Sequence, residues 1–150
     1  MKTFFCEDEE ATKNLGLKLG AQLENGDVIC LTGDLGMGKT ALTKAMCAAQ
    51  GADYSQVTSP SFALLNVYQG RDFPLRHFDL YRLNVVEELE DIGFAEALEE
   101  EGVSLIEWSD LFPEELPENY LQINLMPKES GREITLMPKG ARYQELCEKV

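Results

Sequence analysis

The sequence predicts an α/β protein of three layers, α/β/α, in which helices cover both faces of a mixed, partly antiparallel sheet. Three observations favour this fold. Helical and strand-like segments alternate, two short apolar runs are typical of strands buried on both faces, and two further segments are typical of β-hairpins. The 150 residues contain no repeat, low-complexity tract or linker that divides them. We therefore expect a single domain, residues 1–150.

The first third of the chain predicts a helix, a buried strand and a second helix. The first helix begins at residues 8–9, whose negative charge suits a helix N-terminus, and closes at residues 25–26. Residues 28–31 are apolar and partly β-branched, which is typical of a buried strand. Residues 39–50 predict a second helix, and Gly51 ends it. The apolar residues that recur at helical spacing in the first helix are Ala11, Leu15, Leu19 and Leu23.

The middle of the chain predicts a hairpin followed by helical turns. Two β-rich runs, 62–68 and 75–83, flank a turn at residues 69–72. From residue 85 to residue 98 the apolar spacing becomes helical, with a break at Gly93.

The last third begins with a second short core strand at residues 103–106. Residues 121–125 and 134–136 then alternate between apolar and polar side chains, and residues 128–131 can turn between them. A final helix is expected from about Ala141.

The charge balance excludes a stand-alone nucleic-acid binder. The chain has 13 basic and 27 acidic residues, a net charge of −14 that repels phosphate backbones. Between Arg82 and Lys128 there are 13 acidic residues and no Lys or Arg. This acidic segment is either a solvated helix face or a docking surface for a basic partner.

Composition also predicts where the protein resides. No apolar run approaches the roughly 20 residues that a membrane-spanning helix requires. The short N-terminal run is followed at once by four acidic residues at 7–10, which leaves no room for the core of a secretory signal. The four cysteines lack C-x-x-C spacing, so we interpret them as reduced and mostly buried. We expect a cytoplasmic protein with no membrane partner.

The segment from Gly33 to Thr40 matches the P-loop pattern G-x-x-x-x-G-K-[ST] and lies between a predicted buried strand and a predicted helix. Its glycines let backbone N–H groups turn inward, and the helix that follows adds the positive end of its dipole. Lys39 would contact the β- and γ-phosphates of a nucleotide, and the Thr40 hydroxyl would bind Mg²⁺. The segment therefore predicts nucleoside triphosphate binding and a P-loop NTPase-like fold.

Two acidic residues at strand ends are candidates for a role in hydrolysis. Asp79 follows the apolar run at 75–78, and Glu107 follows the run at 103–106. Sheets of this kind present ligands at the carboxyl ends of their strands, where one acid can hold Mg²⁺ and another can orient water. The alternative for each is an ordinary solvated carboxylate. Beside a P-loop, we interpret at least one of the two as functional.

Three features near these acids are less specific. Residues 58–62 are rich in hydroxyls and contain a proline, so they are either a loop that senses the γ-phosphate or an ordinary turn before a strand. Trp108 is interpreted as a core or rim aromatic. His77 is interpreted as a hydrogen-bonded strand residue rather than a base.

Taken together, these motifs resemble the TsaE (also YjeE) family of bacterial P-loop ATPases. Outside the P-loop, the most specific blocks are H-x-D-L-Y-R-L at residues 77–83 and I-E-W at residues 106–108. The resemblance extends to residues 8–16, 57–62 and 87–90 and follows the order of the family. One departure is Ser61, where the family usually has Thr.

The resemblance implies an ATPase, with Mg²⁺ as cofactor, that serves threonylcarbamoyladenosine synthesis in tRNA. It implies TsaB and TsaD as partners, contact with tRNA only through them, and transfer chemistry that belongs to TsaD. It also places Asp79 and Glu107 at the two acidic positions of the family; we favour Glu107 with Thr40 for the metal and Asp79, beside Lys39, for the attacking water. Thr12 lies near the adenine by family position. The expected nucleotide-binding residues are Thr12, Gly33, Asp34, Leu35, Gly36, Met37, Gly38, Lys39, Thr40 and Ala41.

Two alternative functions remain open from the sequence. A small-molecule kinase uses the same loop, but such enzymes usually gather several arginines over the transferred group, and here the arginines are scattered. A nucleotide-controlled assembly module would bind ATP with only incidental turnover. A GTPase is less favoured because no N-K-x-D segment is present.

Overall fold

A computed structural model of the chain describes residues 1–34, 36, 38–57, 65–81, 83 and 85–150. Within these ranges the strands are β1 (Lys2–Cys6), β2 (Val28–Gly33), β3 (Leu65–Gln69), β4 (Pro74–Asp79), β5 (Val103–Glu107), β6 (Tyr120–Lys128) and β7 (Gly131–Lys139). The α-helices are α1 (Glu9–Ala21), α2 (Lys39–Ala49), α3 (Glu87–Asp91), α4 (Phe94–Glu99) and α5 (Ala141–Glu148). Short 3₁₀ turns cover Tyr54–Gln56, Ser109–Leu111 and Pro113–Glu115.

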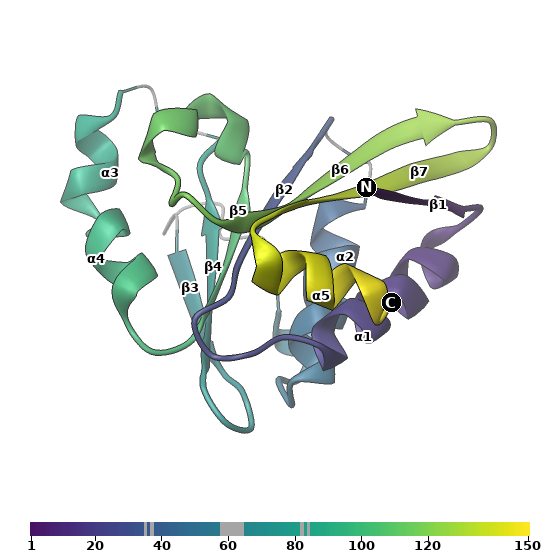
Figure 1. Ribbon diagram of the computed structural model, residues 1–150, viewed down its shortest axis with the longest axis horizontal. Coiled ribbons are helices and arrows are strands. Elements are labelled where there is room, and N and C mark those ends of the chain that lie inside the picture. Colours follow the sequence, from purple (N-terminus) through teal and green to yellow (C-terminus); the bar gives the residue numbers. More distant parts are fainter. Residues whose placement is uncertain (35, 37, 58–64, 82, 84) are drawn as a thin grey trace.

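The strands form one mixed sheet in the order β1-β7-β6-β2-β5-β4-β3. The four central strands β6, β2, β5 and β4 run parallel, whereas β1, β7 and β3 pair antiparallel at the two sides. Helices α1, α2 and α5 pack on one face, and α3 and α4 pack on the other (Figure 1). The predicted three-layer fold is confirmed.

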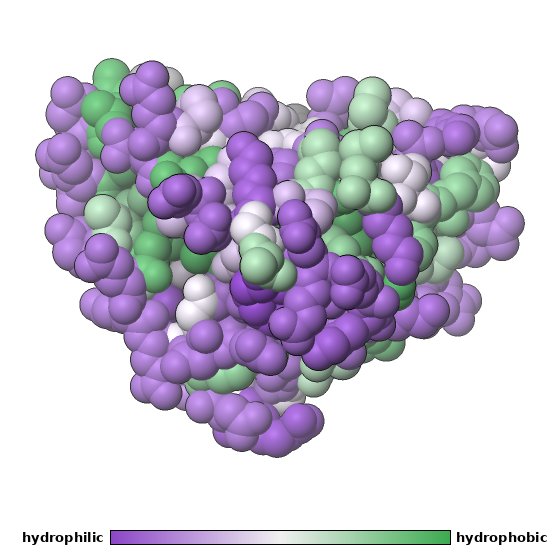
Figure 2. Space-filling model, in the orientation of Figure 1, coloured by the Kyte–Doolittle hydropathy of each residue, from purple (hydrophilic) through white to green (hydrophobic). Residues whose placement is uncertain are grey.

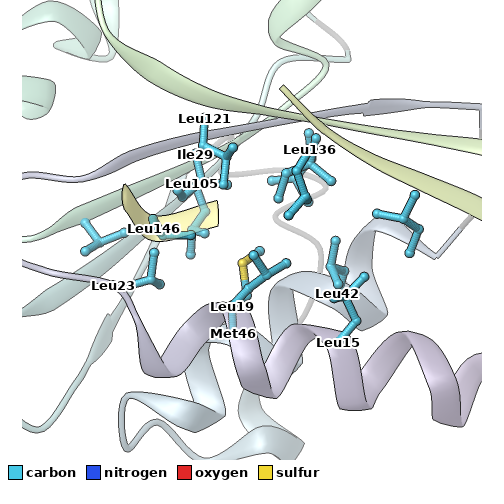
Figure 3. Close-up of a cluster of buried hydrophobic side chains, with 14 of the residues drawn as sticks. Leu15, Leu19, Leu23, Ile29, Leu42, Met46, Leu105, Leu121, Leu136 and Leu146 are labelled. Atoms are coloured by element: carbon cyan, nitrogen blue, oxygen red, sulfur yellow. The ribbon is translucent and has the colours of Figure 1, made fainter. Parts of the chain in front are cut away.

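Strand β2 begins with an unbroken apolar run because both faces of the sheet are covered there. Ile29, Cys30 and Leu31 of β2 are fully buried, as the unbroken apolar run predicts. Figure 3 shows the larger core cluster, in which side chains from α1, α2 and α5 meet those of the central strands.

Alternation along the strands decides which side chains face α2. Phe78 and Ile106 belong to the core cluster under α3 and α4, whereas Leu75 and Leu105 belong to the cluster under α1 and α2. Since successive side chains point to opposite faces, Asp79 shares the face of Leu75. Glu107 shares the face of Leu105 for the same reason, so both acidic side chains lie on the side of the sheet that α2 covers.

The predicted elements are largely confirmed. Asp8 caps α1, accepting a 2.9 Å hydrogen bond from the backbone N–H of Ala11. The break at Gly93 separates α3 from α4, and its φ of 68° is left-handed. Residues 75–79 of the second predicted run pair with residues 65–69 as the expected hairpin, whereas the strand ends at Asp79 and does not extend to residue 83 as predicted. The part of that hairpin prediction at residues 62–64 lies outside the described residues, as does the hydroxyl-rich 58–62 segment.

The predicted end of the first helix is wrong by four residues. Helix α1 ends at Ala21, and not at residues 25–26, because side chains from elsewhere occupy its last carbonyls. The Gln50 amide donates to the Gly20 carbonyl at 2.6 Å, and Arg142 donates to the Gln22 carbonyl at 2.6 Å. Leu23 stays buried although it follows the helix.

Strand β1 was not predicted from the sequence. It is a five-residue edge strand whose pairing partner, β7, lies more than 120 residues further along the chain. Only Cys6 in it is fully buried, so its apolar pattern is short. Local periodicity therefore gave no sign of it.

The four cysteines are free and buried, which confirms their interpretation. Burial raises the pKa of Cys30 and of Cys47 to about 12.

Among the described residues, no helix has the length and apolar character needed to cross a bilayer.

Helices α1 and α2 approach closely because α1 carries glycine where they touch. A Cβ atom on Gly20 would lie 2.4 Å from the Met46 carbonyl oxygen and 2.7 Å from the Ala49 Cβ. The backbone of α2 occupies that space, so the contact cannot be relieved by turning a side chain.

We expect Gly20→Ala to destabilise the protein by about 1–3 kcal/mol, since the added methyl group must push α1 away from α2. At an exposed helix position the same change would stabilise by about 1 kcal/mol, so the sign of the effect is informative. Urea denaturation measures it, with exposed Lys18→Ala in the same helix as control. A stability gain in Gly20→Ala would contradict the packing described above.

Candidate functional site

The turn between β2 and α2 leaves a helix N-terminus open. Gly33 ends β2, where a Cβ atom would lie 2.6 Å from the Leu125 carbonyl oxygen. Gly38 precedes α2 with a left-handed φ of 98°, and no side chain within the described part of the chain caps this helix, in contrast to α1 with its Asp8 cap. The first N–H groups of α2 are therefore available to an anion.

A cavity of about 390 Å³ lies in front of this helix start. Its lining includes three cationic and three acidic side chains, so the site is locally balanced although the chain as a whole is strongly acidic. The lining residues are Glu9, Gly36, Gly38, Lys39, Thr40, Ala41, Lys44, Asp79, Glu107, Trp108 and Arg132.

Lys39 is held inside the protein by several contacts. Its side chain is 5% exposed, its Nζ donates to the Gly33 carbonyl oxygen, and the same Nζ lies 3.4 Å from the centre of the Trp108 ring. Burial lowers the pKa of Lys39, and the nearby carboxylates of Glu107 and Asp79 oppose that shift. Trp108 is thus a half-buried rim aromatic, as predicted, and it covers the lysine of the P-loop.

The two predicted acids are brought together. Asp79 and Glu107 are direct partners in the parallel pairing of β4 with β5, and Glu107 is in turn level with Leu31 on β2. Glu107 is 3% exposed, and its carboxylate is hydrogen-bonded to Nε2 of His77. Asp79 is half-buried and accepts a 3.0 Å hydrogen bond from the Tyr81 backbone N–H.

The other predicted binding residues occupy varied positions. Ala41 lines the cavity, whereas Asp34 is exposed and lies beside it. Thr12 is fully buried below the loop, where its Oγ1 accepts a 3.4 Å hydrogen bond from Arg132. Its role near adenine stays a prediction. Leu35 and Met37 lie outside the described residues.

Sequence reasoning missed three residues of the cavity wall. Lys44 follows Thr40 by one helical turn on α2, so helical spacing could have indicated it. Glu9 stands at the start of α1. Arg132 comes from the start of β7, about 100 residues after the P-loop, and its guanidinium reaches Gly38. No local signal connects Arg132 to the loop.

The residues at the cavity fit a magnesium ion that also contacts a phosphate. Thr40, Asp79 and Glu107 offer oxygen ligands, which Mg²⁺ prefers, and all three line the cavity. Among the described residues no group of three or more His, Cys, Asp or Glu side chains could hold a metal alone. That suits Mg²⁺, which usually binds through one or two carboxylates and takes its remaining ligands from water and substrate phosphates.

Fold and site together define an α/β protein of the P-loop NTPase-like class, with two strand-end carboxylates facing the start of the loop helix. The family model of TsaE, described as threonylcarbamoyl adenosine biosynthesis protein TsaE, matches residues 6–134. The chain therefore belongs to the TsaE family, whose members serve threonylcarbamoyladenosine biosynthesis in tRNA.

Individual relatives agree with this assignment. The tRNA threonylcarbamoyladenosine biosynthesis protein TsaE of Bacillus subtilis is 41% identical over 145 residues, which cover 94% of this chain and 88% of that protein. The TsaE protein of a Nostoc species is 37% identical over 151 residues, covering 97% and 91%. A crystal structure of Bacillus subtilis YdiB is similar with a TM-score of 0.77 and 35% identity, covering 99% of this chain and 92% of that one.

The different burial of the two acids predicts different effects on stability. We expect Glu107→Gln to destabilise the ligand-free protein by about 2 kcal/mol or more, because it removes a buried negative charge beside the Lys39 ammonium. Asp79→Asn should change stability by about 1 kcal/mol or less, because water screens a half-buried carboxylate. Urea denaturation at pH 7 compares the two. A gain in stability for Glu107→Gln would mean that repulsion between the acids dominates instead.

Proposed function

We propose that this chain binds Mg–ATP in the cavity at the start of α2 and hydrolyses it in support of threonylcarbamoyladenosine synthesis in tRNA. In this proposal the chain acts with TsaB and TsaD and leaves the transfer chemistry to TsaD. The observation that carries the proposal is the uncapped N-terminus of α2, which opens on a cavity with cationic side chains around it and two carboxylates opposite.

Four side chains of the cavity have roles that their positions support. The backbone N–H groups of the loop and Lys39 would hold the phosphates, once Lys39 leaves the Gly33 carbonyl. Thr40 and Glu107 would hold Mg²⁺, which when bound neutralises charge on the phosphates. Glu107 suits this role because β5 is the direct neighbour of β2, the strand that leads into the loop. Asp79, one strand further away, would orient the attacking water.

The placement of the arginines favours a hydrolase over a kinase. Of the arginines that the structure describes, Arg132 lines the cavity. Arg71 is exposed and absent from the lining, and Arg76 and Arg142 are engaged elsewhere. Arg82 lies outside the described residues. Arg76 donates hydrogen bonds to the carbonyl oxygens of residues 100 and 101. Arg142 forms an ion pair with Asp27 at 2.7 Å. A kinase that closes several arginines over a transferred phosphoryl group would need them at the cavity.

We expect Lys39→Ala to weaken binding of Mg–ATP by about 10- to 100-fold, because it removes a charged hydrogen-bond donor to the phosphates. Asp79→Asn should keep affinity within about threefold and lower phosphate release by about 100-fold or more, as expected for loss of a group that acts on the attacking water. Calorimetry measures binding, and phosphate release with and without TsaB–TsaD measures turnover.

These variants separate the candidate functions. If the intact chain does not bind Mg–ATP, the proposal of nucleotide binding is wrong. If Asp79→Asn sustains repeated rounds of tRNA modification, ATP controls assembly and turnover is incidental. A phosphorylated metabolite in place of free phosphate would indicate a kinase.

The acidic segment supports docking to a partner. Helices α3 and α4 and the turns after β5 hold most of the excess negative charge, and the exposed face shown in Figure 2 mixes hydrophilic residues with apolar ones over this region. Exposed apolar side chains such as Val85 and Leu111 stand among the acids. Such a surface, residues 85–118, suits a partner with a basic and partly apolar contact area.

We expect the triple variant Glu87→Lys, Glu90→Lys and Glu96→Lys to weaken binding to TsaB–TsaD by about tenfold or more, because it reverses charge on exposed positions of α3 and α4. Changing Glu10, Glu145 and Glu148 to Lys adds the same charge on α1 and α5 and serves as control. Titration of labelled protein with the purified complex gives both affinities. Equal effects of the two triple variants would show that net charge, and not this surface, matters.

A further inference from the structure

The contact between His77 and Glu107 is not used by the function proposed above. His77 is fully buried on β4, and its Nε2 forms a hydrogen bond with the Glu107 carboxylate at the end of the neighbouring strand β5. Histidine is two residues before Asp79, so alternation places both on the face that α2 covers. The ring therefore lies behind the carboxylate that lines the cavity.

The surroundings of the second ring nitrogen, Nδ1, indicate which nitrogen of His77 carries a proton. Nδ1 is buried and has no hydrogen-bond partner among the residues that the structure describes. A proton on Nδ1 would leave a buried N–H without an acceptor and would direct the Nε2 lone pair at an oxygen of Glu107, which costs free energy twice. A proton on Nε2 gives a donor to the carboxylate and leaves only a lone pair unpaired. The surroundings thus favour a ring that carries a proton on Nε2.

We propose that His77 is a positioning residue for Glu107. Its Nε2–H donates to one carboxylate oxygen and fixes the orientation of the carboxylate at the cavity wall. This inference rests on the proposed function, in which Glu107 holds Mg²⁺. Groups that orient a metal-binding carboxylate by hydrogen bonds commonly change metal affinity by 10- to 100-fold when removed.

Glutamine and leucine at position 77 form a matched pair of variants. The amide nitrogen of glutamine can stand where Nε2 stands and donate to Glu107, whereas leucine fills similar space and donates nothing. A role limited to filling the core would be met by either residue, and leucine would suit an apolar core better. A positioning role requires the donor.

The first test uses the intact, ligand-free chain. His77 is the single histidine in the sequence, so ¹⁵N-histidine labelling gives one imidazole signal set in a long-range ¹H–¹⁵N spectrum. We expect a proton on Nε2, and we expect the Nε2 signal to shift in Glu107→Gln. A ring that carries its proton on Nδ1 alone would overturn the inference, because Nε2 could not then donate to Glu107.

The second test measures the contribution of Mg²⁺ to nucleotide binding. The affinity for a non-hydrolysable ATP analogue is measured with Mg²⁺ and with EDTA, and the ratio of the two is compared among variants. We expect His77→Leu to lower this ratio by about tenfold or more and His77→Gln to keep it within about threefold, with unchanged affinities in EDTA. Equal ratios in both variants, or a loss in folded His77→Gln, would overturn the inference.

Failure of this inference is distinguishable from failure of the proposed function. A wild-type chain that does not bind the analogue refutes nucleotide binding, and the ligand-free spectrum still decides whether His77 donates to Glu107. If His77→Leu does not fold in a thermal melt, the folded His77→Gln variant and the spectrum decide alone.

Discussion

The register between the central parallel strands is the constraint on which the site depends. Leu31 of β2 is level with Glu107 of β5, and Glu107 is level with Asp79 of β4. Because three carboxyl ends are aligned at one edge of the sheet, the turn that leaves β2 and the two acids that end β4 and β5 meet at a single cavity. A shift of one residue in either pairing would turn an acid towards α3 and α4 instead.

Electrostatics at this edge differ from those of the whole molecule. The chain carries a large negative charge, yet the cavity brings cations from α2 and β7 against acids from three other elements. Lys39 is the residue that connects these groups. Burial disfavours its ammonium, and the carboxylates of Glu107 and Asp79 favour it, so the charge is retained inside the protein by its neighbours. A phosphate that drew Lys39 away would therefore have to replace these contacts.

Family membership and geometry support different parts of the functional conclusion. Similarity to TsaE proteins over most of the chain assigns it to threonylcarbamoyladenosine biosynthesis. The open helix N-terminus, the oxygen-bearing side chains and the absence of clustered arginines at the cavity within the described chain are the physical reasons for our proposal that it acts there as an ATPase. His77 lies behind Glu107, the acid that we propose to hold Mg²⁺, and neither the loop motif nor the family description mentions this contact.

The sequence alone determined the local elements that make the site. Glycine spacing between an apolar run and a helical run located the loop at residues 33–40, and Asp79 and Glu107 were recognised because each ends an apolar strand. These signals are local, since they depend on periodicity, on turn residues and on strand ends. The same reasoning placed most helices and strands within a few residues.

Only the tertiary structure decided what depends on distant pairing. Strand β1 forms because it pairs with the free edge of β7. Helix α1 ends at Ala21 because Gln50 and Arg142 donate hydrogen bonds to the carbonyls at its end. Arg132 reaches the loop because β7 folds back beside β6. The sequence predicts a hydrogen-bonded strand residue at His77, but its partner is Glu107, 30 residues further along the chain, and the other ring nitrogen has no partner in the described part of the chain. Such contacts produce no periodic pattern in the sequence, because they depend on which strands become neighbours and not on the residues adjacent in the chain.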